Sequence, residues 1–212
     1  GGLVGAQRTE LMEGLFGIRH LSSGTIKMHG KEVKIKRSRD AMDAGLGMIT
    51  EDRRGNGIFG CLSIKDNTGI SIYNKHLKAG FILDHPTINK IVDDSIKQLS
   101  IKTPSMQQHI ENLSGGNQQK VIVSRWLAND PEILIMDEPT RGIDVGAKHE
   151  IYEIMEQLAD QGKSIIMISS EMPELLGMAD RVYVMCNGKI TGEIDQKEDM
   201  TQEKVMSFAT QF

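Results

Sequence analysis

The sequence has few cysteines, few aromatic residues and no long apolar run, and these shortages exclude several classes of protein. Among its 212 residues only Cys61 and Cys186 are cysteines. They lie far apart and lack His or Cys neighbours at metal-binding spacing, which argues against a disulfide framework and against a zinc site. No apolar run approaches the roughly 20 residues of a bilayer-spanning helix, and no signal peptide is recognised. We therefore expect a reducing cytosolic setting, with any membrane association made through a partner.

An excess of basic residues is also missing. The formal net charge is −4, with 25 Lys and Arg against 29 Asp and Glu. Proteins that mainly bind nucleic acid usually carry a basic excess, so we expect no nucleic-acid partner. The hydrophobic fraction of 39% over 212 residues is enough for one substantial core.

Three short apolar runs in the second half of the chain have the character of buried strands that end in polar residues: 132–140, 164–171 and 181–188. Between the first two runs, the span 148–162 has apolar residues at helical spacing and ends at Gly162. A strand, a helix and a strand in succession predict a right-handed crossover, parallel strands and the α/β class. Ligands of such sheets gather at the carboxyl ends of the strands. Those ends carry Asp137, Glu138 and Ser170.

The first half of the chain has a different pattern. We expect a helix over 9–17, a hairpin over 24–35 that turns at His29 and Gly30, and a strand over 46–52. From about 62 to 130 the sequence is mainly helical, with 87–101 as its clearest amphipathic stretch. We interpret 62–130 as a helical subdomain inserted between two parts of the sheet, and 199–212 as a loop followed by a short terminal helix.

The first residues are a candidate phosphate loop. Such a loop has the pattern GxxxxGK followed by Ser or Thr, because glycines let backbone amides wrap the phosphates, the lysine meets the terminal phosphates and the hydroxyl meets magnesium. The matching positions are Gly2, Gly5, Ala6, Gln7, Arg8 and Thr9. Gln7 replaces the second glycine, at a point where a positive φ is often needed. Arg8 replaces the lysine and keeps the charge in a bulkier group.

A glycine turn before a helix is the alternative interpretation of residues 2–9. A phosphate loop normally follows a buried strand, whereas this sequence begins inside the loop. Either the chain is a fragment of a longer protein or the assignment of a phosphate loop is wrong.

The run 132–140 delivers two acids at the end of an aliphatic strand. Asp137 would hold Mg²⁺ through water, together with the Thr9 hydroxyl, and Glu138 would be the general base that activates a water. The alternative is a pair of solvated acids in a turn before Pro139.

Residues 113–120, LSGGNQQK, form a polar turn before an amphipathic helix, where backbone N–H groups and the helix dipole attract phosphate. This turn resembles the signature loop of ATP-binding-cassette ATPases, ILIMDEPT their Walker B strand, and 140–144 the loop after it, with Asp144 at the acidic position. Together with GLVGAQRTE, TEDRRGNGI and SSEMPELLGMADR, these motifs make the sequence resemble the second cassette of bacterial monosaccharide importers whose ATPase subunit holds two cassettes.

The resemblance implies a P-loop NTPase core with a mostly parallel sheet, a partial antiparallel β subdomain and the inserted helical subdomain. It implies one nucleotide-binding domain over 1–212, truncated at its start, where the adenine-stacking aromatic of the family normally lies. The implied ligands are ATP and Mg²⁺. The implied partners are a first cassette in the same full-length chain, membrane permease subunits and, indirectly, a sugar-binding protein. The implied location is the cytoplasmic face of the bacterial inner membrane, as a peripheral protein.

Four positions depart from a standard cassette. Glu51 stands where the family usually has a glutamine and Ser170 where it usually has a histidine, in addition to Gln7 and Arg8. We therefore expect the chain's own phosphate site to bind nucleotide but to hydrolyse it poorly. Whether Glu138 still activates water there is left open.

The signature loop is intact, and cassettes of this family pair head to tail. The resemblance therefore implies that this loop completes the nucleotide site of the partner cassette, with contacts from Ser114, Gly115, Gly116 and Gln118.

Two rival functions remain open at this level: a non-hydrolysing regulatory module that binds nucleotide and dimerises, and a soluble cassette ATPase of DNA repair or translation. The helical subdomain and the Glu51 loop would contact the permease by resemblance, and an ordinary surface is the alternative.

Overall fold

The computed structural model describes residues 1–211 and divides the chain into two compact units. The first unit contains Gly1–Ala44, Ile135–Glu138 and the residues from Ile166 onward; the second contains Gly45–Leu134 and Pro139–Ile165. The predicted helical span 62–130 lies wholly inside the second unit. That 1–212 is a single nucleotide-binding domain remains a prediction.

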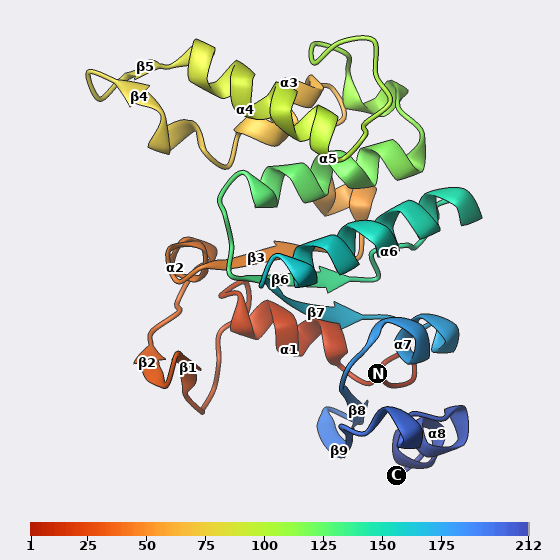
Figure 1. Ribbon diagram of the computed structural model, residues 1–212. Helices are drawn as coiled ribbons and strands as arrows, with labels where there is room; N and C mark the ends of the chain where they lie inside the picture. The colour runs from red at the N-terminus through yellow and green to blue at the C-terminus, as the bar shows by residue number, and fades with distance from the viewer. Residues whose placement is uncertain (212) are drawn as a thin grey trace. The chain divides into compact units, whose positions relative to one another are not determined.

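Three strands form a sheet in the order β3-β6-β7 (Figure 1). Its strands are β3 (Leu46–Ile49), β6 (Ile133–Asp137) and β7 (Ser164–Ile168). β6 and β7 are parallel, because the Ser164 N–H bonds to the Glu132 carbonyl at one end and the Glu138 N–H bonds to the Ile168 carbonyl at the other. The predicted strands at 46–52, 132–140 and 164–171 are therefore confirmed, as is the parallel pairing of the last two.

The first unit has helices at the start of the chain and an antiparallel hairpin near its end. Its further elements are α1 (Arg8–Leu15), β1 (Ile26–Met28), β2 (Lys31–Val33), α2 (Ser38–Asp43), α7 (Met172–Met178), β8 (Val182–Cys186), β9 (Lys189–Ile194), a 3₁₀ turn (Lys197–Asp199) and α8 (Gln202–Ala209). The predicted helix at 9–17, strand at 181–188 and terminal helix are thus confirmed.

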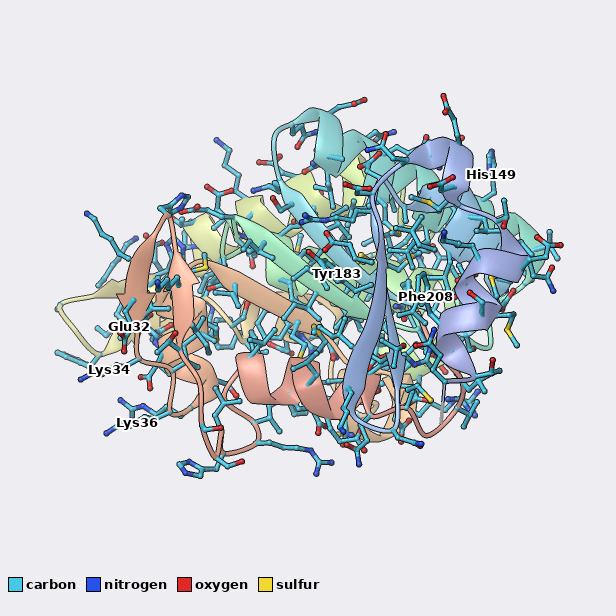
Figure 2. The ribbon with its side chains drawn as sticks, turned by 90° about the horizontal axis from the view of Figure 1, so that it is seen from below. Glu32, Lys34, Lys36, His149, Tyr183 and Phe208 are labelled. Atoms are coloured by element: carbon cyan, nitrogen blue, oxygen red, sulfur yellow. The ribbon has the colours of Figure 1, made fainter. Side chains whose placement is uncertain are left out.

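The β1–β2 hairpin turns where the sequence predicts it. Met28 pairs with Lys31 at the end of the ladder, and the two turn residues His29 and Gly30 both have positive φ, 49° and 75°. Figure 2 shows Glu32, Lys34 and Lys36 projecting from this part of the unit, and all three are exposed. The hairpin is therefore a charged, solvent-facing element.

The β8–β9 hairpin and helix α8 share a small core. It contains the buried side chains of Val182, Val184, Ile194, Met200 and Val205, and Phe208 packs against it. Phe208 lies beside the hairpin (Figure 2), where its ring occupies the space in which a side chain at Gly192 would stand. β9 was not predicted from the sequence.

The second unit is built on helices that pack side by side around α5 (Figure 1). Its further elements are a π-helical turn (Arg53–Gly57), α3 (Ile64–Gly69), a 3₁₀ turn (Tyr73–Lys75), β4 (Leu77–Lys78), β5 (Ile82–Leu83), α4 (His85–Gln98), a 3₁₀ turn (Ile110–Asn112), α5 (Gly115–Leu127) and α6 (Val145–Asp160). The predicted helices at 87–101 and 148–162 are confirmed, and the β4–β5 hairpin interrupts the span predicted as helical.

A buried cation ties three of these segments together. Arg125, on α5, is 8% exposed and donates from Nε to the Asn67 carbonyl (2.6 Å), from Nη1 to the Gly57 carbonyl (2.7 Å) and from Nη2 to Asn67 Oδ1 (2.8 Å). Its guanidinium also lies 5.3 Å from the centroid of the Phe59 ring. Burial lowers the pKa of Arg125 to about 10, which still leaves it charged at neutral pH.

Among residues 1–211, no helix combines the length and apolar character needed to cross a bilayer.

Candidate functional site

The candidate phosphate loop leads directly into helix α1, which begins at Arg8. Gln7 precedes the helix with φ 66° and ψ 33°, in the left-handed region. The expectation that Gln7 occupies a positive-φ position is therefore confirmed, and it explains why a glycine suits this point of such a loop. Within the loop, the Ala6 N–H bonds to the Leu3 carbonyl at 3.1 Å. This geometry is common to a phosphate loop and to a plain glycine turn, so nucleotide binding at residues 2–9 remains a prediction.

Thr9 and Asp137 meet within the first unit although 128 positions separate them in the chain. Thr9 Oγ1 donates to Asp137 Oδ2 at 2.7 Å. Asp137 is only 1% exposed, and its other oxygen, Oδ1, has no hydrogen-bond partner. Burial raises the pKa of Asp137 above its ordinary value, against the lowering effect of the Thr9 hydrogen bond.

This pair fits a magnesium ion. A carboxylate oxygen and a hydroxyl oxygen are ligands of the kind that Mg²⁺ prefers, and the ion usually keeps further positions for water and phosphate oxygens. The unpartnered, buried Oδ1 of Asp137 is a polar atom that such an ion would satisfy. Thr9 and Asp137 are therefore the residues of this chain that would hold it.

Arg8 contacts the predicted general base. Its Nη2 lies 3.7 Å from Glu138 Oε1, with the two side chains 12% and 10% exposed, and its Nη1 donates to the Ser169 carbonyl at 2.8 Å. The other carboxylate oxygen, Glu138 Oε2, accepts a hydrogen bond from Ser170 Oγ at 3.1 Å. Both oxygens of Glu138 are thus engaged by two of the four residues that depart from the standard cassette. These two contacts compete with any water for the oxygens of this carboxylate.

The signature turn lies at the start of α5 in the second unit. Ser114 is exposed and caps the helix, with φ −60° and ψ 156°. Its Oγ lies 2.9 Å from Asn117 Nδ2 and 3.5 Å from the Asn117 backbone nitrogen. The turn therefore presents a capping hydroxyl at the positive end of a 13-residue helix, which is a suitable arrangement for an anion.

Gly116 and Gln118 support this turn from within. A Cβ added at Gly116 would stand 2.4 Å from the Cβ of Ala147, so the glycine lets α5 and α6 approach closely. Gln118 is 6% exposed and donates from Nε2 to the Ile110 carbonyl (3.2 Å) and the Leu113 carbonyl (3.1 Å). The close helix approach at Gly116 and the buried amide of Gln118 favour a supporting role. Contact of either residue with nucleotide remains a prediction.

The remaining predicted residues have defined partners in the second unit. Asp144 caps α6, where its Oδ1 accepts from the Ala147 N–H at 3.0 Å. The Glu51 carboxylate forms an ion pair with Arg141. The roles of Asp144 and Glu51 at a nucleotide site remain predictions.

Three residues around these groups could not be assigned a role from the sequence: Arg53, Asn117 and Arg141. Arg53 donates to the carbonyls of Arg141 (3.3 Å) and Gly142 (3.4 Å). Its Nη2 would also lie 3.1 Å from a Cβ at Gly115. The only sequence signal for Arg53 was the pair of arginines in TEDRRGNG, which gives no direction for either side chain.

The sequence of this chain matches a known protein family and known relatives. The model of the ABC transporter family matches residues 2–141. Over 212 residues the chain is 54% identical to a galactose/methyl galactoside import ATP-binding protein of Clostridium tetani, covering 100% of this chain and 42% of that protein. It is 49% identical to a ribose import ATP-binding protein of Oceanobacillus iheyensis, covering 99% of this chain and 42% of that protein. The chain thus spans about two fifths of the length of these relatives.

Solved structures show the same fold. A nucleotide-free ATP-binding cassette from an ABC transporter superposes with a TM-score of 0.82 at 20% identity, over 97% of this chain and 82% of the other. The cbiO1 protein of Clostridium perfringens, part of an ABC transporter complex, gives a TM-score of 0.77 at 24% identity, over 97% and 79%. These two likenesses confirm the predicted α/β class with its parallel sheet and antiparallel strands.

Proposed function

The chain belongs to the ABC transporter family, and from that premise we propose that it is the second nucleotide-binding cassette of a two-cassette ATPase subunit that energises monosaccharide import. Family membership rests on the match over residues 2–141, which is more than half of the chain. It confirms the predicted resemblance to ATP-binding-cassette ATPases, a family whose members generally bind ATP with Mg²⁺.

The relatives support the substrate class and the two-cassette arrangement. Those with the names quoted above import galactose, methyl galactoside or ribose, so we propose a monosaccharide of the galactose type as the cargo. Because the chain covers 42% of each, each relative has room for two cassettes of this size. The proposed partners are an intact first cassette, membrane permease subunits and, through them, a sugar-binding protein. The proposed location is the cytoplasmic face of the inner membrane.

The observation that carries the proposed division of labour is the engagement of Glu138 by Arg8 and Ser170. At the chain's own site, Thr9 and Asp137 would hold Mg²⁺, which when bound neutralises charge on the phosphate oxygens. Arg8 directs one end of its guanidinium to Glu138 and the other to the Ser169 carbonyl, so less of its charge is available to a terminal phosphate. We therefore propose that this site holds nucleotide and hydrolyses it poorly.

The signature turn would then serve the partner cassette. Ser114 is exposed at the start of α5, and Gly115 beside it leaves the backbone N–H groups uncovered by a side chain of its own. Hydrogen bonds from such groups to a charged acceptor contribute about 1.5–3 kcal/mol each. Two or three of them would close the pair when ATP is present and weaken it after hydrolysis.

The experiment that tests this proposal compares ATP turnover by the chain alone with turnover by the chain paired with an intact first cassette. Activity should appear on pairing and disappear with Ser114→Arg, which fills the turn with a bulky side chain. Ser22→Arg is the matched control, because Ser22 is an exposed serine of the first unit. The substitution there makes the same change of size and charge. Robust turnover by the isolated chain would refute the proposal.

A second candidate is a regulatory module that binds nucleotide and dimerises without turnover. The engagement of Glu138 by Arg8 and Ser170 favours it too, since these contacts compete with a catalytic water for the carboxylate. This candidate predicts that pairing leaves the turnover of the first cassette unchanged and that Ser114→Arg has no effect. The relatives quoted above are all named for sugar import, which gives no support to a cassette of DNA repair or translation.

A further inference from the structure

We propose that Asn117 is a positioning residue, which fixes the Ser114 hydroxyl as a hydrogen-bond donor to a terminal phosphate oxygen of the nucleotide. The inference rests on the proposed function, in which the signature turn completes a nucleotide site. It adds to that site a residue whose role the sequence alone does not indicate. It also explains how a neutral hydroxyl is made selective for an acceptor such as phosphate.

The hydrogen bonds of Ser114 carry the argument. A serine hydroxyl has one O–H donor and two acceptor lone pairs. Asn117 Nδ2 donates to Ser114 Oγ at 2.9 Å, and the Asn117 backbone N–H approaches the same oxygen at 3.5 Å. Both donors come from one residue and occupy the acceptor side of the hydroxyl. What is left to Ser114 is its proton, and among residues 1–211 the structure records no acceptor for it.

The amide of Asn117 has its orientation set by a second contact. Its Oδ1 accepts a hydrogen bond from the backbone N–H of Lys102 at 2.7 Å. A backbone N–H is always a donor, so the amide oxygen must face Lys102 and the NH₂ group must face Ser114. A flipped amide would bring two donors together at Lys102.

The far end of this chain of contacts is firmly held. Ile101, next to Lys102, is 5% exposed, and its N–H bonds to the Ile96 carbonyl in the last part of helix α4 at 2.9 Å. The backbone after α4 therefore orients Asn117, and Asn117 orients Ser114. Because the hydroxyl is exposed at the N-terminus of α5, its remaining proton and the helix dipole favour the same kind of ligand, an anion that only accepts.

The test is Asn117→Asp in the assembly of this chain with an intact first cassette, measured as steady-state ATP turnover. The substitution keeps the shape and the acceptor for Lys102, but its second oxygen would accept the Ser114 proton and so reverse the hydroxyl. Removing one donor to a reacting oxyanion lowers kcat by about 10²–10³-fold. We expect a loss of about 10²-fold for Ser114→Ala and of at least about 10-fold for Asn117→Asp. Asn112→Asp is the control, because Asn112 is an exposed neighbour that receives the same added charge.

A double-mutant cycle separates positioning from a general loss of structure. If Asn117 acts through Ser114, then Asn117→Asp in the Ser114→Ala background should lower turnover no more than Asn112→Asp does there. An equal loss in both backgrounds would overturn the inference, and so would an Asn117→Asp variant that matches Asn112→Asp throughout. If Ser114→Ala itself leaves turnover unchanged, the proposed function fails instead. Unchanged thermal unfolding midpoints would show that each variant is folded.

Discussion

The guanidinium of Arg8 and the carboxylate of Glu138 face each other across 3.7 Å, at the end of strand β6 and the start of helix α1. Both side chains are largely withdrawn from water, and Ser170 binds the second carboxylate oxygen at 3.1 Å. In the proposed function this contact is what separates nucleotide binding from hydrolysis at the chain's own site. It is also an ion pair whose contribution to stability can be measured.

Arg8→Met and Glu138→Gln should each lower the free energy of unfolding by about 2–4 kcal/mol, because each leaves the other group buried without its charged partner. The double variant should lose less than the sum, with a coupling of about 1–3 kcal/mol. Chemical denaturation of the four proteins measures this cycle. Arg19→Met is the control, since the Arg19 side chain is 58% exposed and should change stability by less than about 0.5 kcal/mol. Strict additivity of the two losses would show that the contact contributes nothing.

As the pH falls, magnesium-dependent nucleotide binding should weaken at a higher pH than it would if the magnesium ligand were an exposed aspartate. Mg²⁺ needs the ionised carboxylate, and burial raises the pKa of Asp137 above the ordinary value. Affinity should therefore fall as the pH falls through that raised pKa. Titration with a fluorescent nucleotide, with and without Mg²⁺, measures it.

The same shift has an opposite sign for the stability of the metal-free chain. Because the folded-state pKa of Asp137 lies above the unfolded one, its contribution to stability is fully present below the unfolded pKa and is lost as the pH rises through the folded pKa.

The assignment of Asp137 as a magnesium ligand is tested by substitution. Asp137→Asn should remove both the Mg²⁺ dependence of nucleotide binding and the pH dependence of that binding. Asp43→Asn, at an exposed residue, should preserve both. A magnesium effect that survives in Asp137→Asn would contradict the assignment.

Gly116→Ala should destabilise the second unit by about 1–3 kcal/mol, because the new methyl group would lie 2.4 Å from the Cβ of Ala147 and α5 and α6 would have to separate. Gly146→Ala is the matched control on α6. The nearest atom to its new Cβ is Asp144 Oδ1 at 3.4 Å, so the better helix propensity of alanine should leave stability unchanged or raise it by up to about 1 kcal/mol. Denaturant midpoints distinguish the two, and equal effects would show that the helices are not closely packed at Gly116.

Arg125→Lys should lower the free energy of unfolding by about 2–4 kcal/mol, because one ammonium cannot reproduce three forked hydrogen bonds to Asn67 and Gly57 in a buried site. Arg54→Lys is the control, because it makes the same substitution at an exposed arginine. It should have little effect on the free energy of unfolding. Thermal unfolding monitored by circular dichroism is sufficient. A loss below about 0.5 kcal/mol would mean that the Arg125 network adds no net stability.

Local patterns in the sequence predicted most of the elements near the site. The aliphatic runs at 133–137 and 164–168 form adjacent parallel strands, of which β6 is buried almost throughout, as its continuous apolar run predicts, whereas β7 has alternate residues exposed. The turn at His29 and Gly30 produced the predicted hairpin. Strand β9, KITGEI, escaped prediction because only Ile194 among its six residues is buried, so its apolar alternation is weak.

The residue types of the site could likewise be predicted from the amino-acid sequence alone. The acids after β6, the Thr9 hydroxyl and the polar turn before α5 are local features, each set by a stretch of fewer than ten residues. The contacts of residues such as Asn117 and Arg125 could not be predicted from local sequence. Their effect depends on backbone groups far along the chain, including the carbonyl of Gly57, 68 positions from Arg125.

The sequence by itself therefore determined the cassette family, the order of strands and helices around the site, and which chemical groups are available. Only the tertiary structure decided that Arg8 engages Glu138, that Thr9 meets Asp137, and that the Asn117 amide faces Ser114. The reason is physical. Local patterns depend on neighbours along the chain, whereas a hydrogen bond depends on the distance and direction between two atoms, which packing alone establishes.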